Sequence, residues 1–259
     1  MTPLIHPTAL IDEGAELAAD VSVGPYAVIG AGVKVGEGTS IGPHVVIEGS
    51  TTIGSGNRVW QFATIGSAPQ DLKYGGEPTR LEIGSGNTIR EFSSINRGTV
   101  DGGGVTRVGH DNLLMAYSHV AHDCRIGDRV VMANAATLAG HVVVEDHAAV
   151  GGLVAIHQFV RVGQSAFLGG GAMVSLDIPP FCTAAGDRAR LQGLNVVGLK
   201  RRGFGEATLK ELREAYRVLF QSSLKLRDAL EQLKTEYGAS SEVMAFVDFV
   251  ESSERGICR

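Results

Sequence analysis

The chain has 259 residues, three cysteines and a formal net charge of −5 at neutral pH. This near balance of charge excludes a nucleic-acid or membrane-surface partner held by bulk electrostatics. The cysteines lack C-x-x-C spacing, so they indicate neither a disulfide framework nor a cysteine zinc site. The N-terminus has no basic segment followed by an apolar one, and no stretch is long enough to span a bilayer. We therefore expect a cytoplasmic protein without stable membrane insertion.

An aliphatic residue recurs at every sixth position through most of the chain. One run extends from Ile5 to Ile65, a short one from Ile83 to Ile95, and a third from Val108 to Val174. No helix or half-buried strand has a period of six, whereas a parallel β-helix built from hexapeptides does. Three hexapeptides close one triangular coil, so residues eighteen apart stack on neighbouring coils. The repeats predict roughly nine coils, a prism on the order of 40 Å tall.

Glycine often follows the aliphatic residue, as at Gly24, Gly42 and Gly151. We expect these glycines to lie at the corners of the coil and to relieve backbone strain there. The repeat is interrupted twice, at about 67–82 and 98–107, and we interpret both segments as loops protruding from the prism. Long loops on a rigid scaffold often carry function, although a tolerated insertion is the alternative.

Beyond Pro180 the six-residue pattern gives way to helical spacing. Apolar residues then predict three helices, at about 206–220, 223–237 and 241–253. We therefore expect a mainly β protein with a parallel β-helix over 1–187 and a C-terminal α-helical domain over 188–259. The helices would cover the open end of the coil stack and protect its edge strands.

A cluster of histidines occupies outward positions of successive coils. Eighteen-residue stacking places Gly140 between His122 and Gln158. Close to this column lie Asp123, His119, His141 and His157. Neutral imidazole takes a proton from a hydroxyl at cytoplasmic pH, and a neighbouring carboxylate orients it. The backbone N–H of a glycine, open to a substrate carbonyl, holds a developing oxyanion. These parts predict acyl transfer to an alcohol.

Zinc is the competing use of clustered histidines. The candidate ligands are His119, His122, His141, His147 and His157. Three histidines are enough for a catalytic zinc site. Against zinc, His119 and His122 are expected on different sides of one corner, and no cysteine ligand is near. We expect no metal and no cofactor, and the zinc alternative stays open.

Several motifs resemble one family of hexapeptide acyltransferases. They are Ala121-His122-Asp123-Cys124, Ile156-His157-Gln158-Phe159, Pro69-Gln70-Asp71-Leu72-Lys73 and Leu199-Lys200-Arg201-Arg202-Gly203. Over essentially the whole chain the sequence is similar to the UDP-N-acetylglucosamine O-acyltransferases, which begin lipid A biosynthesis in Gram-negative bacteria. The resemblance implies a left-handed β-helix and a homotrimer with sites between subunits. It also implies two substrates, a 3-hydroxyacyl chain on acyl carrier protein and UDP-N-acetylglucosamine.

The resemblance also implies roles for individual residues. His122 would be the general base for the glucosamine 3-hydroxyl, Asp123 would orient it, and the Gly140 amide would hold the oxyanion. Substrate contacts are implied for Gln70, Asp71, Lys73, His119, His141, His157, Gln158, Asn195 and Arg201. Gly170 matches the position that limits acyl-chain length, and its missing side chain predicts a longer hydroxyacyl chain.

Val197 departs from the family pattern, since a glutamate is common there, and the segment Gly186-Asp187-Arg188-Ala189 departs as well. Both departures bear on nucleotide contacts rather than on the chemistry. Basic residues are candidate contacts for the acidic carrier protein, namely Lys200, Arg201, Arg202, Arg213 and Arg217. Three alternatives remain: an N-acyltransferase of the same pathway, a sugar acetyltransferase that uses acetyl-CoA, and a β-helix resembling the zinc carbonic anhydrases.

Overall fold

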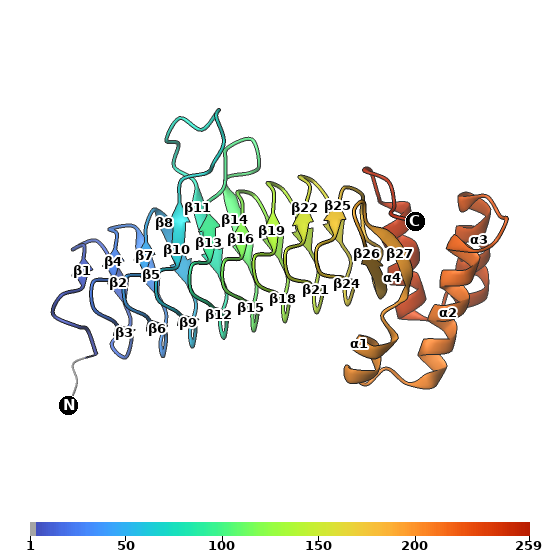
Figure 1. Ribbon diagram of the computed structural model, residues 1–259, viewed down its shortest axis with the longest axis horizontal. Coiled ribbons are helices and arrows are strands. Elements are labelled where there is room, and N and C mark those ends of the chain that lie inside the picture. Colours follow the sequence, from blue (N-terminus) through green and yellow to red (C-terminus); the bar gives the residue numbers. More distant parts are fainter. Residues whose placement is uncertain (1–3) are drawn as a thin grey trace.

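A long triangular prism of stacked coils, followed by a group of helices, forms the architecture (Figure 1). The computed structural model describes residues 4–259. Each coil contributes one short strand to each of three parallel sheets, which confirms the left-handed parallel β-helix. Along the described chain, no helix is both long and apolar enough to cross a membrane.

We number the sheets in the order in which the chain enters them. The first contains β1 (Leu10–Ile11), β4 (Val28–Ile29), β7 (Val46–Ile47), β10 (Thr64–Ser67), β13 (Ser94–Asn96), β16 (His119–Val120), β19 (Thr137–Leu138), β22 (Ala155–Ile156) and β25 (Met173–Val174). The second contains β2 (Glu16–Leu17), β5 (Val33–Val35), β8 (Ser50–Ile53), β11 (Arg80–Ile83), β14 (Val105–Val108), β17 (Arg125–Ile126), β20 (Val143–Val144) and β23 (Arg161–Val162). The third contains β3 (Ser22–Val23), β6 (Ser40–Ile41), β9 (Arg58–Val59), β12 (Thr88–Ile89), β15 (Leu113–Leu114), β18 (Val131–Met132), β21 (Ala149–Val150), β24 (Phe167–Leu168), β26 (Cys182–Ala185) and β27 (Arg190–Leu194).

Three edges separate these sheets: the first edge joins the first and second sheets, the second edge joins the second and third, and the third edge joins the third and first. The aliphatic residue of each hexapeptide points inward, as shown by Ile29, Ile47 and Ile65, which are at most 1% exposed. Stacked layers of such residues form one continuous core. No layer is stable without its neighbours, as in other repeat architectures.

The prediction that the corner glycines relieve backbone strain is wrong. The left-handed backbone at the corners is carried by the third residue after the aliphatic one, as at Tyr26 (φ 58°), His44 (φ 55°) and Phe62 (φ 62°). The glycines are needed because successive coils approach closely. A Cβ on Gly24 would lie 2.8 Å from the backbone nitrogen of Pro43, and one on Gly42 would lie 2.8 Å from that of Gln61.

Two loops leave the prism at the first edge, on neighbouring coils (Figure 1). Residues 68–79 join β10 to β11 and residues 97–104 join β13 to β14, so both loops are shorter than predicted at their C-terminal ends. Thr64 pairs with Ser94 and Ser94 with His119, so these two coils are longer than the regular one in which His119 pairs with Thr137. The loops therefore lengthen their own coils at the cost of one register shift, between Ile65 and Ser67 where β10 pairs with β13, and β11 pairs regularly with β8 and β14.

Four helices follow the sheets: α1 (Val196–Arg201), α2 (Glu206–Phe220), α3 (Leu226–Tyr237) and α4 (Ser241–Glu251). The last three correspond to the predicted helices, with α3 starting later than expected, and α1 was not predicted. A second core forms around Phe181 and Phe246, which are fully buried. The division between residues 187 and 188 stays a prediction, because the β26–β27 hairpin spans it and adds two strands to the third sheet.

Candidate active site

The first edge brings together most of the residues predicted from the sequence. His119 begins the first-sheet strand β16 of one coil, and His122 and Asp123 form the corner between β16 and β17. Gly140 and His141 form the same corner one coil above, and their position is fixed by the hydrogen bond from the His141 N–H to the His122 carbonyl (3.0 Å). This confirms the eighteen-residue stacking that the repeat predicted for this column.

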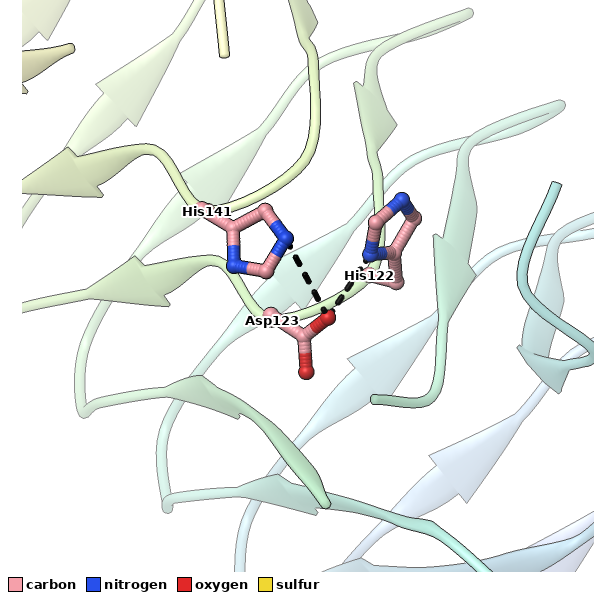
Figure 2. Close-up of side chains that lie close together, drawn as sticks. All are labelled: His122, Asp123 and His141. Carbon is pink, nitrogen blue, oxygen red and sulfur yellow. Dashed lines mark hydrogen bonds and ion pairs between the residues drawn. The ribbon is translucent and has the colours of Figure 1, made fainter. Parts of the chain in front are cut away.

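His122 and Asp123 form a hydrogen-bonded pair (Figure 2). The distance from His122 Nδ1 to Asp123 Oδ2 is 2.7 Å, and the side chains are 14% and 1% exposed. Because an ionised carboxylate only accepts, the imidazole donates from Nδ1 and presents the lone pair of Nε2. That tautomer is the one that takes a proton from a substrate hydroxyl.

The loop at 97–104 surrounds the Asp123 carboxylate. Thr99 donates to it twice, from its backbone N–H to Oδ1 (2.9 Å) and from Oγ1 to Oδ2 (2.6 Å). The Asp123 N–H donates to Oγ1 of Thr106 (2.8 Å). Gly102 lies so close to the carboxylate that a Cβ there would overlap it. Asp123 also holds a left-handed backbone (φ 62°), which turns its side chain toward this loop.

Gly140 lies directly over the His122 ring. A Cβ at this position would lie 2.6 Å from Cε1 and 2.8 Å from Nε2 of the imidazole. Only glycine therefore leaves the space in which a substrate atom reaches both the ring nitrogen and the Gly140 backbone. This is the arrangement expected of a base next to an oxyanion donor.

Burial affects the two neighbouring histidines. His119 donates or accepts through Nδ1 at 2.7 Å from Ser94 Oγ, and burial lowers its pKa, with a further lowering by His122. Burial also lowers the pKa of His141, while the carboxylates of Asp123, Asp71 and Asp101 oppose that shift. The His141 ring stacks on Phe159 with centroids 4.4 Å apart. Burial therefore favours the neutral form of both rings, and their contacts with Ser94 and Phe159 hold them at the edge of the site.

The loop at 68–79 carries the predicted sugar-binding residues. Asp71 and Lys73 line a cavity of about 250 Å³ together with residues of the second loop, Thr99 to Asp101. Asp71 accepts the Lys73 backbone N–H (2.9 Å), and Lys73 and Gln70 are exposed. Above the histidines, His157 and Gln158 are exposed, and the Arg255 guanidinium donates to His157 Nδ1 (2.8 Å).

Three predicted residues lie at the other edges of the prism. Asn195 and Arg201 line a cavity of about 640 Å³ at the second edge, together with Arg129, His147 and Phe167. The Asn195 side chain also caps α1, accepting the Gly198 N–H (3.1 Å) and donating to the Ser165 carbonyl (3.0 Å). Gly170 lies at the third edge, between β24 and β25, and is exposed. One chain therefore does not bring these residues to His122.

His122, Asp123 and His141 also offer ligand atoms within 4.8 Å of one another, the only such group among residues 4–259. The Nε2 of His141 lies 3.8 Å from Asp123 Oδ2. Both carboxylate oxygens, however, already accept hydrogen bonds from Thr99 and His122. A metal on Asp123 would displace buried donors and leave them unpaired, which is costly. The donor set favours the acid–base interpretation over zinc.

Sequence reasoning missed Thr99, Thr106 and Arg97. Arg97 donates to Tyr74 Oη (3.1 Å) and to the Gly66 carbonyl (2.7 Å), so it ties the first loop to the prism. The available signal was the glycine-rich stretch from Gly98 to Gly104, because a segment with that composition packs tightly against its neighbours. Which of its polar residues faces the carboxylate depends on the loop conformation, which the repeat does not determine.

The fold, with its repeats of six residues, places the chain in the class of hexapeptide-repeat transferases. The family model for bacterial transferase hexapeptides matches residues 32–67 and 106–140. A model described as UDP-N-acetylglucosamine O-acyltransferase, domain 2, matches residues 177–258. The chain belongs to the UDP-N-acetylglucosamine O-acyltransferase family, as the following relatives establish.

The acyl-[acyl-carrier-protein]–UDP-N-acetylglucosamine O-acyltransferase of Alkalilimnicola ehrlichii is 56% identical, over 98% of this chain and 99% of its own. The enzyme of that name from Paraburkholderia phymatum is 53% identical, over 98% and 99%. Among solved structures, LpxA from Acinetobacter baumannii superposes with a TM-score of 0.97 at 45% identity, over 99% of this chain and 100% of its own. The UDP-N-acetylglucosamine acyltransferase of Francisella novicida gives 0.96 at 39% identity, over 98% and 94%.

Proposed function

We propose that His122 is the general base in the transfer of a (R)-3-hydroxyacyl chain from acyl carrier protein to the 3-hydroxyl of UDP-N-acetylglucosamine, the first step of lipid A biosynthesis. The observation that carries this proposal is the buried His122–Asp123 pair facing the open backbone of Gly140. Relatives at 56% and 53% identity over nearly full length bear the name of this reaction.

The proposed chemistry follows from the arrangement of the donors. His122 Nε2 takes the proton of the sugar hydroxyl as the oxygen attacks the thioester carbon. The Gly140 N–H donates to the oxyanion, and Asp123 stabilises the imidazolium that forms. When the intermediate collapses, the carbon–sulfur bond breaks and the imidazolium returns its proton to the leaving thiolate of the carrier. No cofactor is required, because the thioester is already activated.

We also propose a homotrimer. Three-fold symmetry would bring the first edge of one subunit against the second edge of the next, and the third edges of all three subunits would meet at the axis. The outward residues of the second sheet are mostly charged, namely Glu16, Lys34, Arg80, Glu82, Arg107, Arg125 and Arg161. The outward residues of the first sheet carry no formal charge. Among the outward residues of the third sheet, up to Thr183, the only charged one is Arg58. The first and third faces, which are uncharged apart from Arg58, suit burial between copies, while the charged second face suits solvent.

The third edge, where the two uncharged faces meet, carries a ladder of stacked rings. Tyr26, His44, Phe62, Phe92 and Tyr117 have successive centroids 4.9 to 5.2 Å apart. Phe62 and Phe92 are each 44% exposed in one chain. A three-fold arrangement that buries the first and third sheets places this ladder, defined as the aromatic ladder, at the symmetry axis.

In that arrangement the first edge of one subunit faces the second edge of the next. His122 and the two loops would then meet Asn195 and Arg201 of the next subunit, with Gly170 at the inner end of the same cleft. This suits a sugar nucleotide held between Lys73 and Arg201 and an acyl chain directed toward the axis. Carrier protein would dock on the basic residues of α1, of its C-cap and of α2, namely Lys200, Arg201, Arg202, Arg213 and Arg217.

The test is acyl transfer from 3-hydroxyacyl carrier protein to UDP-N-acetylglucosamine by the intact protein and by His122→Ala. We expect the variant to lose several orders of magnitude in kcat with its oligomeric state unchanged. Mixing His122→Ala with Arg201→Ala and allowing subunits to exchange would restore up to about a quarter of the sites if each cleft uses two subunits. Retained activity in His122→Ala would refute the mechanism, and absence of complementation would refute the shared cleft.

We propose a cytoplasmic location, supported by the three cysteines, which are all free and buried as in a reducing compartment. A glycine at position 170 leaves the inner end of the cleft open, which supports a longer hydroxyacyl chain. A series of carrier-bound chain lengths tests this, and preference for the shortest would contradict it.

A further inference from the structure

We infer that Thr99 is a positioning residue that sets the orientation and the basicity of the Asp123 carboxylate, and through it the strength of His122 as a base. The inference rests on the proposed role of His122. Thr99 belongs to the loop at 97–104, and no hexapeptide position or predicted motif identifies it.

The direction of the Thr99 hydroxyl follows from its contacts. Its Oγ1 accepts the N–H of Gly102 (3.2 Å) and lies 2.6 Å from Asp123 Oδ2. Since a carboxylate accepts, the single hydroxyl proton points at Asp123. The backbone N–H of the same residue occupies Oδ1 (2.9 Å), so Thr99 grips the carboxylate at both oxygens and fixes its plane.

The loop is built to hold Thr99 in this place. The Thr99 carbonyl accepts the N–H of Gly104 (2.7 Å) and that of Gly102 (3.2 Å), which closes two turns around it. Gly102 lies over the carboxylate at a distance that leaves no room for a side chain. Thr99 is 6% exposed and the Asp123 side chain 1%, so water does not compete for these bonds. Excluding water strengthens the coupling between Asp123 and His122.

Oδ2 of Asp123 is shared between two donors, Thr99 Oγ1 at 2.6 Å and His122 Nδ1 at 2.7 Å. A hydrogen bond from one donor stabilises the carboxylate anion, and the carboxylate then binds a second donor less strongly. Without the Thr99 hydroxyl, the carboxylate would hold a protonated His122 more tightly, so the imidazole would stay protonated to a higher pH. The other ionisable groups near the pair are His119, His141, Asp71 and Asp101, and a substitution at residue 99 removes none of their charges.

The experiment compares Thr99→Val, Thr99→Ser and Thr51→Val in the intact protein. Thr51 is a matched control because it is also buried and donates to a backbone carbonyl, that of Glu48 (2.7 Å), rather than to Asp123. For Thr99→Val we expect kcat above the acidic limb to fall about ten- to hundredfold, because the Asp123 carboxylate loses the bond that fixes its plane and no longer holds the His122 ring in position. The acidic limb of its pH profile should move to higher pH, and KM for UDP-N-acetylglucosamine should not change. Thr99→Ser should resemble the wild type, and Thr51→Val should change thermal stability alone.

A second perturbation covers the case in which Thr99→Val does not fold. Gly102→Ala adds a methyl group that must displace the carboxylate, and Gly102 has no left-handed backbone that alanine would strain. We expect the same loss of kcat. Independently of activity, NMR of histidine-labelled protein, assigned with His122→Asn, should show His122 titrating at higher pH in Thr99→Val than in wild type. An unshifted titration, or a pH profile like that of Thr51→Val, overturns the inference. An inactive wild type with the shifted titration overturns only the proposed reaction.

Discussion

The close approach of Gly140 to the His122 ring makes Gly140→Ala a direct test of the site. The new Cβ would lie 2.6 Å from Cε1 and 2.8 Å from Nε2, and its nearest contacts are all atoms of that imidazole. Carbon atoms in contact lie about 3.5–4.0 Å apart, so the ring must move by about 1 Å. A displacement of that size costs about 100-fold in rate.

The assay is steady-state acyl transfer with both substrates varied, together with thermal unfolding. We expect kcat to fall about 100-fold. The melting temperature should change little, because a side chain rather than the backbone gives way. Gly30→Ala is the matched control, since it lies on the first edge several coils below the site and a Cβ there would make only an ordinary contact with Glu48 Cα, at 3.5 Å. A Gly140→Ala variant with wild-type kcat would show that the ring does not need this position.

Four further results are expected. Asp123→Asn should lower kcat at least about 100-fold while leaving KM for the sugar nucleotide unchanged, because the amide no longer stabilises the imidazolium. A rise in KM as large as the fall in kcat would contradict this. Phe92→Asp should dissociate the assembly, as measured by light scattering, because it puts charge into the aromatic ladder; an intact trimer would argue against the ladder as the axis. Burial lowers the pKa of His119 and His141, so their contribution to the free energy of unfolding is complete above about pH 6.5 and is lost as the pH falls through their pKa values in the folded protein. In chemical denaturation, His119→Gln should reduce the fall of the unfolding free energy with decreasing pH, and an unchanged pH dependence would contradict this. Burial raises the pKa of Cys124 to about 12, so native protein at pH 8 should resist thiol reagents until denatured; rapid native labelling would contradict the buried core position.

The repeat predicted the prism because period six leaves few alternatives, and it placed Gly140 over His122 correctly because no insertion lies between Val108 and Val174. The helical spacing of the apolar residues after the repeat predicted the three long helices. The repeat did not predict the reason for the corner glycines, since the backbone contact between coils depends on how closely they stack.

Below His122 the simple count fails, because the inserted loops lengthen the offset between neighbouring coils and each by a different amount. A composition rich in glycine marked the loop at 97–104, but its fold, and hence the two bonds from Thr99 to Asp123, depends on tertiary contacts. The distribution of site residues over three edges was likewise invisible in the sequence, because an edge is defined only once the coil boundaries are known.

Both loops leave the prism at the end of a first-sheet strand, and the next strand resumes its pairing unchanged. The residues that contact the substrate in the loops can therefore change separately from the residues of the histidine corner. A recombination event confined to residues 68–79 and 97–104 would exchange the groups that meet the substrate, while the layers of aliphatic residues and the histidine corner passed unaltered to the descendant. In such an exchange Thr99 is the loop residue that has to be retained, because it alone in the exchanged loops bonds to the Asp123 side chain.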